Sequence, residues 1–186
     1  MRPPKARGAP SSLPEAGALL ESAATVSASR RNRVRQSILW AGLVVGTFDA
    51  IFAVVLYKQP ATAIFHSVAS GLIGKAAYDG GIATAILGAF LHYLIATSWG
   101  AAYIVASSRL RVLARQWVPC GIAYGVLVYF AMNYVVLPLS RVSFARSFQM
   151  AFFQNKIWLA GLIGHMVLIG LPIAFFARRA HSRAAR

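Results

Sequence analysis

The chain has 186 residues, of which 58% are hydrophobic, and nineteen Lys and Arg against four Asp and Glu give it a formal charge of +15. A soluble domain of this size would mix acidic and basic residues over its surface, and so few acids exclude carboxylate-rich catalysis. The basic residues cluster at the ends of apolar blocks about 20 residues long, which indicates an integral membrane protein and not a nucleic-acid-binding one.

The N-terminal segment, residues 1–37, is rich in Pro, Ala, Ser and Arg and has no sustained apolar period. We therefore expect a disordered basic tail. The run RRNRVR at 30–35 directly precedes the first apolar block. Such a run is typical of a cytoplasmic anchor that also contacts anionic lipid.

Four apolar blocks are long enough to cross a bilayer, and they predict transmembrane helices at 38–57, 84–106, 118–138 and 157–177. Basic clusters precede the first span, separate the second from the third at 109–115, and form a short C-terminal tail at 180–186. All three clusters lie on one side only if there are four spans and both termini are cytoplasmic. The expected fold is an all-α bundle of four transmembrane helices.

Two segments between the spans are expected on the outer side. Residues 61–78 have one apolar and one polar face, which indicates a helix that lies at the interface or enters the membrane as a re-entrant piece. A fifth span there would move the basic cluster to the outer side. Lys75 and Asp79 are secondary site candidates on the outer side, and because they are four residues apart they could pair on a helix. The loop 141–156 carries phenylalanines four residues apart, so a second interfacial helix is expected.

Glycine motifs recur in alternate spans. A Gly-x-x-x-Gly motif lies in the first and third spans and a Gly-x-x-x-His motif in the second and fourth, at Gly42/Gly46, Gly121/Gly125, Gly88/His92 and Gly161/His165. Small residues let membrane helices approach closely, so these glycines are predicted to pack helices. The order of motifs also raises the hypothesis of a parallel internal duplication. Glycine is common in membrane helices, so the pattern alone does not decide it.

Each span carries one polar residue inside its apolar stretch: Asp49, His92, Asn133 and His165. A rise of about 1.5 Å per residue places Asp49 and the two histidines near one depth, with Asn133 closer to the outer side. All four share a helix face with small residues and are expected to point into the bundle. Ionisable groups inside a membrane often mark ion or substrate pathways, so this intramembrane polar cluster is the main functional candidate.

Several segments together resemble a group of small uncharacterised bacterial inner-membrane proteins with four predicted transmembrane helices: GTFDAIFA, ASGLIGKAAYDGG, LHYLIA, AMNYVVLPLS and LIGHMVLIGLPIAFFARR. The resemblance covers roughly residues 38–179. It implies the four-span architecture and a bacterial inner membrane, but it implies no activity, and no site residue is carried over from it.

Three functions stay open. The first is proton-linked solute binding or transport by a homo-oligomer or a larger membrane complex, with Asp49 exchanging a proton; the small multidrug resistance transporters are an analogy. The second is a structural or accessory subunit whose polar cluster only packs helices. The third is a b-type haem protein with His92 and His165 as axial ligands. No other cofactor and no metal site is expected, and the absence of a catalytic motif argues against an enzyme.

Overall fold

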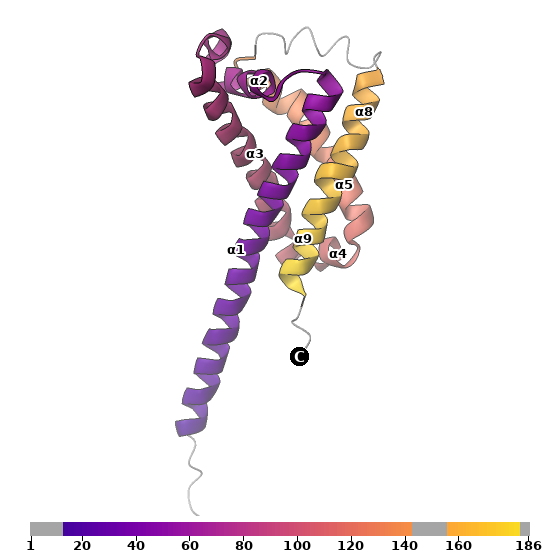
Figure 1. Cartoon of the computed structure of the whole chain (residues 1–186). Helices are drawn as coiled ribbons and strands as arrows, with labels where there is room; N and C mark the ends of the chain where they lie inside the picture. Colours follow the sequence, from indigo (N-terminus) through magenta and orange to yellow (C-terminus); the bar gives the residue numbers. More distant parts are fainter. Residues whose placement is uncertain (1–12, 143–155, 183–186) are drawn as a thin grey trace, which may run out of the picture.

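The computed structural model describes residues 13–142 and 156–182, and every regular element in these two ranges is helical (Figure 1). Four helical stretches are long and apolar enough to cross a membrane: Gly17–Tyr57, Gly81–Arg109, Trp117–Leu139 and Lys156–His181. The predicted all-α, four-span fold is confirmed. The last three stretches extend the predicted spans by only a few residues at either end.

The chain runs through the bundle as follows. The first half contains α1 (Leu13–Tyr57), α2 (Ala61–Ile73), the 3₁₀ helix η1 (Gly74–Tyr78), α3 (Gly81–Arg109) and the short α4 (Arg111–Arg115). The third span consists of α5 (Trp117–Ala131), the π-helix η2 (Met132–Val136) and α6 (Leu137–Leu139). The fourth consists of α8 (Lys156–Gly164), the π-helix η4 (His165–Gly170) and α9 (Leu171–His181).

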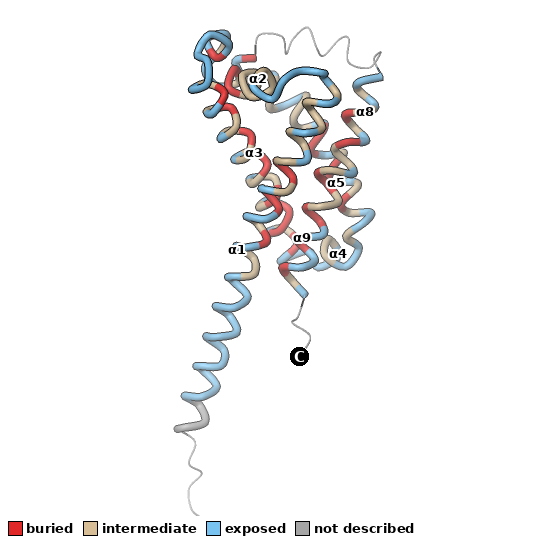
Figure 2. Tube along the Cα trace, in the orientation of Figure 1, coloured by how far each residue is buried: buried red, intermediate tan, exposed pale blue. Residues whose placement is uncertain are grey.

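Helix α1 corrects the expectation of a disordered tail. It is one continuous helix of 45 residues from Leu13, so the prediction for 1–37 is wrong over residues 13–37, while residues 1–12 lie outside the described part. Residues 17–32 are exposed and project beyond the bundle (Figures 1 and 2). The alanines of this segment favour helix, and the adjoining span supplies the nucleus from which a helix propagates.

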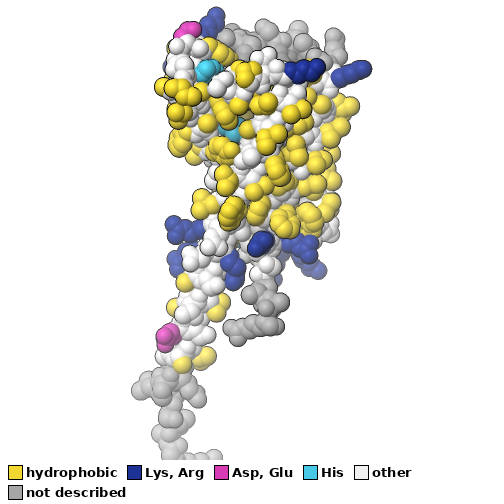
Figure 3. Space-filling view, viewed as in Figure 1, with side chains coloured by type: hydrophobic (Ala, Val, Ile, Leu, Met, Phe, Trp, Pro, Cys, Tyr) yellow, Lys and Arg dark blue, Asp and Glu magenta, His cyan; other side chains and the backbone are white. Residues whose placement is uncertain are grey.

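The tightest packing lies in the half of the bundle nearer the described termini. There α1 packs along α3 and α9, and α5 packs along η4 and α9. The fully buried side chains are mostly small or branched, among them Ala41, Val45, Ile104, Ile173 and Ala177. Large apolar side chains instead cover the outside of the bundle, between Lys and Arg at both ends (Figure 3). An apolar outer belt of this kind suits contact with lipid.

At the opposite end of the bundle, α2 runs crosswise over the long helices and packs mainly on α3 (Figure 1). Its Gly71 carbonyl accepts a hydrogen bond of 2.9 Å from the Arg141 backbone N–H, which ties α2 to the end of the third span. Among the described residues, Lys75 and Asp79 form no ion pair, so that prediction is wrong. The reason is that η1 is a 3₁₀ helix with about three residues per turn, so residues four apart do not lie on the same face. The interfacial helix expected within 141–156 lies almost wholly outside the described residues.

Each π-helix lies just before a proline. Segment η2 ends two residues before Pro138, and η4 ends two residues before Pro172. Proline lacks an N–H and its ring collides with the carbonyl four residues earlier, so a locally wider helix relieves both problems. Both prolines therefore lie within continuous spans and do not end them.

The C-terminal tail begins later than expected. The tail was predicted from residue 180, but α9 continues to His181, and Ala180 is buried. The His181 ring is hydrogen-bonded to the Ser107 hydroxyl at 2.9 Å (Nε2 to Oγ), which holds the end of α9 against α3. Residues 183–186 lie outside the described ranges.

Candidate functional site: an intramembrane cavity

A cavity of about 350 Å³ lies inside the bundle, towards the end that α2 covers. Ligand pockets in proteins are roughly 300–1,000 Å³, so this one suits a small molecule. Its walls come from α1, α2, α3, the third span and η4, and most of the lining is Val, Leu and Ile. The polar groups on its lining, apart from the Trp99 indole, are Asp49, Ser67, His92, Ser140 and His165.

The cavity exists because α3 and α5 diverge. They are held together towards the end nearer the described termini, where the Tyr124 hydroxyl donates to the Trp99 carbonyl at 2.8 Å and the Tyr124 ring lies 4.7 Å from that of Tyr103. Beyond that contact α3 leans away from the rest of the bundle towards α2 (Figure 1). The space between them is the cavity, with Trp99 from α3 and Val128 from α5 on its lining.

Asp49 is the only acidic residue between Glu21 and Asp79, and it faces this cavity from α1. It is half-buried, and within residues 13–142 and 156–182 its carboxylate has no hydrogen-bond or ion-pair partner. It interacts electrostatically with His165. A carboxylate on an apolar wall is costly unless a proton or a cation neutralises it.

His92 is buried and is held by α1. Its Nε2 donates to the Gly46 carbonyl at 2.8 Å, and its ring makes edge contacts with Phe65 at 5.9 Å and Tyr93 at 5.6 Å. A carbonyl oxygen can only accept, so the proton of this bond lies on Nε2 and only Nδ1 remains for other chemistry.

His165 is arranged the opposite way. Its Nδ1 donates to the Gly161 carbonyl in its own helix at 3.0 Å, and its ring lies 4.9 Å from that of Tyr129. In the described part of the chain its Nε2 has no hydrogen-bond partner. The two histidines on the cavity lining therefore leave different ring nitrogens free.

Asn133 does not join the other three residues. Its Nδ2 donates to the Tyr129 carbonyl one turn earlier at 2.8 Å, and it is absent from the cavity lining. Asn133 is the second residue of η2, and a π-helix has more residues per turn than the α-helix on which its predicted face was based. The structure therefore brings Asp49, His92 and His165 to one cavity and leaves Asn133 bonded within its own helix.

All six glycines predicted to pack helices lie at close contacts. A side chain at these positions would meet Thr97 from Gly42, Tyr93 from Gly46, the Phe65 backbone from Gly88, Gly170 and Ala174 from Gly121, the His165 backbone from Gly125, and Tyr129 from Gly161. Gly164 and Gly170 make similar contacts that the spacing of motifs did not reveal. The α2 side of the cavity was also missed, although the polar face of 61–78 already carried Ser67.

A bis-histidine haem would have to use the Nδ1 of His92 and the Nε2 of His165, because the other nitrogen of each ring is hydrogen-bonded to a backbone carbonyl. The described residues contain no group of three or more His, Cys, Asp or Glu placed to hold a metal ion.

Compared with known proteins, the chain matches no protein-family model, no curated sequence and no solved structure. The assignment of a function therefore depends on the chemistry of the cavity.

Proposed function

We propose that this multi-pass membrane protein binds a small lipophilic cation in its cavity, and that binding is linked to a proton on Asp49. The observation that carries the proposal is a carboxylate on the wall of a mostly apolar cavity, with no hydrogen-bond or ion-pair partner among the described residues. Because either a proton or a cation can neutralise this group, the two compete for it. Such competition is the step that proton-linked transport of a cation requires.

The remaining lining favours a solute with an apolar body. Val, Leu and Ile side chains from several helices would surround that body, and the Trp99 indole offers an aromatic face near a positive charge. The free nitrogens of His92 and His165 would accept hydrogen bonds from polar hydrogens on the solute or on a bound water.

A purely structural role explains less. Interhelical hydrogen bonds in membranes contribute only about 0.6 kcal/mol on average, and Asp49 makes none to the described residues. The glycine contacts and the buried small or branched side chains pack this bundle without an acid. A role as an accessory subunit therefore leaves Asp49 unexplained.

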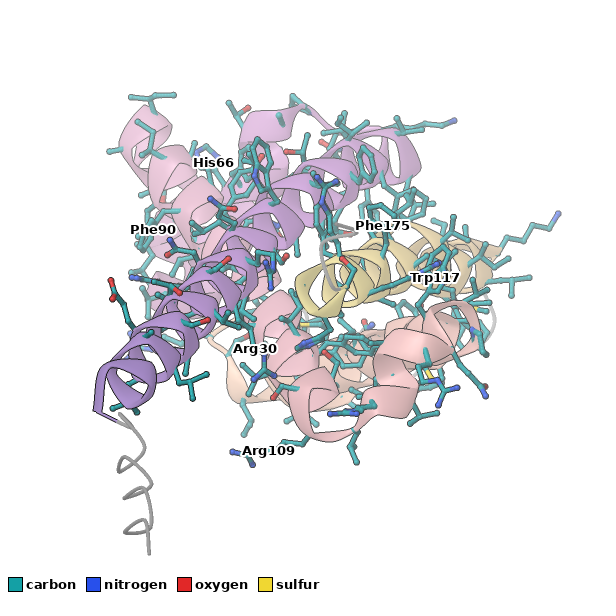
Figure 4. All side chains as sticks on the ribbon, turned by 90° about the horizontal axis from the view of Figure 1, so that it is seen from below. Arg30, His66, Phe90, Arg109, Trp117 and Phe175 are labelled. Carbon is teal, nitrogen blue, oxygen red and sulfur yellow. The ribbon has the colours of Figure 1, made fainter. Side chains whose placement is uncertain are left out.

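We also propose a location in a bacterial inner membrane, with both described ends of the chain in the cytoplasm. Among the described residues, that end holds Arg30, Arg31, Arg33, Arg35, Arg109, Arg111, Arg115, Arg178 and Arg179, and the other end holds Lys58, Lys75, Arg141 and Lys156. An excess of basic residues marks cytoplasmic loops and attracts anionic lipid. Figure 4 views the molecule from this end, with Arg30 and Arg109 labelled and Trp117 beside Phe175, their rings 6.0 Å apart.

Two probes of one shape and opposite charge test the proposal: tetraphenylphosphonium and tetraphenylborate. Binding of each to the purified protein in mild detergent is measured by calorimetry against a detergent blank. We expect wild type to bind the phosphonium and not the borate, and Asp49→Asn to weaken phosphonium binding at least tenfold. Asp79→Asn is the matched control, because Asp79 is exposed and does not line the cavity, and it should bind like wild type. Equal affinity of Asp49→Asn and wild type would contradict the proposal.

A further inference from the structure

The two halves of the bundle pack in the same register. Helices α1 and α3 form the first hairpin, and α5–α6 with α8–α9 form the second. In the first, Gly42 faces Thr97 and Gly46 faces Tyr93; in the second, Gly121 faces Gly170 and Ala174, and Gly125 faces His165 and Met166. The residue numbers of Gly42 and Gly46 in α1 differ from those of the two glycines in α5 by one constant offset. For the second helix of each hairpin a different constant offset applies: it relates His92 to His165, Tyr93 to Met166 and Thr97 to Gly170. Sequence motif and three-dimensional contact therefore repeat together.

The offset in residue number that relates the glycines of α1 to those of α5 also makes Val128 the residue that corresponds to Asp49. Val128 is buried, with 2% of its surface exposed, and it lines the same cavity as Asp49. The corresponding histidines, His92 and His165, line it as well. The cavity is thus placed where the two hairpins meet, and each hairpin contributes one histidine and one residue at the position of the acid.

The repeat is broken in one place, which is where the cavity forms. Helix α1 of the first hairpin packs along α9 of the second, but the equivalent pair, α3 and α5, diverges. A fully symmetric bundle would close this gap.

We infer that the membrane domain consists of two copies of one hairpin, and that Val128 is the counterpart of Asp49 and determines the charge of the ligand. This inference rests on the proposed binding of a lipophilic cation. Because the second copy carries valine, the cavity has one carboxylate and takes a ligand with one positive charge. A carboxylate at residue 128 would face the ligand from the opposite half, so it would either replace Asp49 or add a second site for positive charge.

An exchange of the two residues tests the inference. Asp49→Val should lose tetraphenylphosphonium binding at least tenfold, and Asp49→Val/Val128→Asp should regain most of it. Val128→Asp alone should gain at least tenfold in affinity for the dication paraquat. Suppose that wild type binds the phosphonium and that neither Asp49→Val nor the exchanged double variant binds it. Val128 is then not the counterpart of Asp49, while the proposed function stands. If wild type binds no phosphonium, both fail.

An apolar variant covers the case in which a charge at residue 128 prevents folding. Val128→Phe places a ring in the cavity without a charge and should weaken phosphonium binding at least tenfold. Leu127→Phe is the matched control, because Leu127 is half-exposed on the outer face of the same helix, and it should bind normally. Normal binding by a folded Val128→Phe protein would overturn the assignment of Val128 to the ligand site.

Discussion

The two hairpins use the same glycine register for different purposes. In the first, Gly46 faces the Tyr93 ring, whereas in the second, Gly125 faces the backbone of His165 and Met166. The first hairpin also carries the Asp49 carboxylate, and its helix α3 leans away from the rest of the bundle. The second carries Val128 at the corresponding position. The second hairpin is therefore the more tightly packed of the two, while both contribute a histidine to the cavity and only the first contributes a carboxylate.

The largest expected effect is on the free energy of unfolding when Gly125 or Gly46 is replaced by alanine. Gly125→Ala should destabilise the protein by roughly 1–3 kcal/mol, because a Cβ there meets backbone that cannot move aside. Gly46→Ala should cost less, since the Cβ there meets a side chain, Tyr93, which can shift at the expense of its hydrogen bond to Thr47. Unfolding in SDS, followed by circular dichroism, gives both free energies.

Gly17→Ala is the control for helix propensity. Gly17 is exposed, and a Cβ added there would have nothing within 4 Å, so this change should be neutral or stabilise by up to about 1 kcal/mol. A Gly46→Ala variant less stable than Gly125→Ala would reverse the comparison between the hairpins.

Replacing either histidine by alanine should change the free energy of unfolding less than Gly125→Ala does. The two substitutions should also differ in whether they affect stability or ligand binding more. His92→Ala removes a hydrogen bond between helices and should cost about 0.6–1.7 kcal/mol of unfolding free energy. His165→Ala removes only a bond within its own helix and should cost less. It should still weaken phosphonium binding, because it removes from the cavity lining a ring that would contact the ligand. The same SDS and calorimetric measurements apply, and a greater loss of stability in His165→Ala would contradict this assignment.

The spans were predictable from sequence because hydrocarbon thickness imposes a length and an apolar composition that are visible residue by residue. The span predicted at 84–106 is a helical stretch from Gly81 to Arg109 in the structure, and the one predicted at 118–138 runs from Trp117 to Leu139. The start of α1 was not predictable in this way, because composition typical of a tail does not prevent a helix from continuing out of the membrane.

The site was predictable only in part. Asp49, His92 and His165 follow from helical spacing, since Asp49 and His92 lie within α-helices and His165 directly follows α8 as the first residue of η4. Asn133 did not follow, because η2 changes the number of residues per turn ahead of Pro138. The cavity itself depends on the angle between α3 and α5 and on the position of α2, which are set by contacts between distant segments that no local pattern contains.

The central claim is that a proton and a cation compete for Asp49. The most direct test is the affinity for tetraphenylphosphonium, measured from pH 4 to pH 9, for wild type and Asp49→Asn. We expect the wild-type affinity to fall as the pH is lowered, approaching about tenfold per pH unit, as for one proton displaced per ligand. Asp49→Asn should bind weakly without that dependence. A wild-type affinity that does not change with pH, or the same pH dependence in Asp49→Asn, would contradict the account.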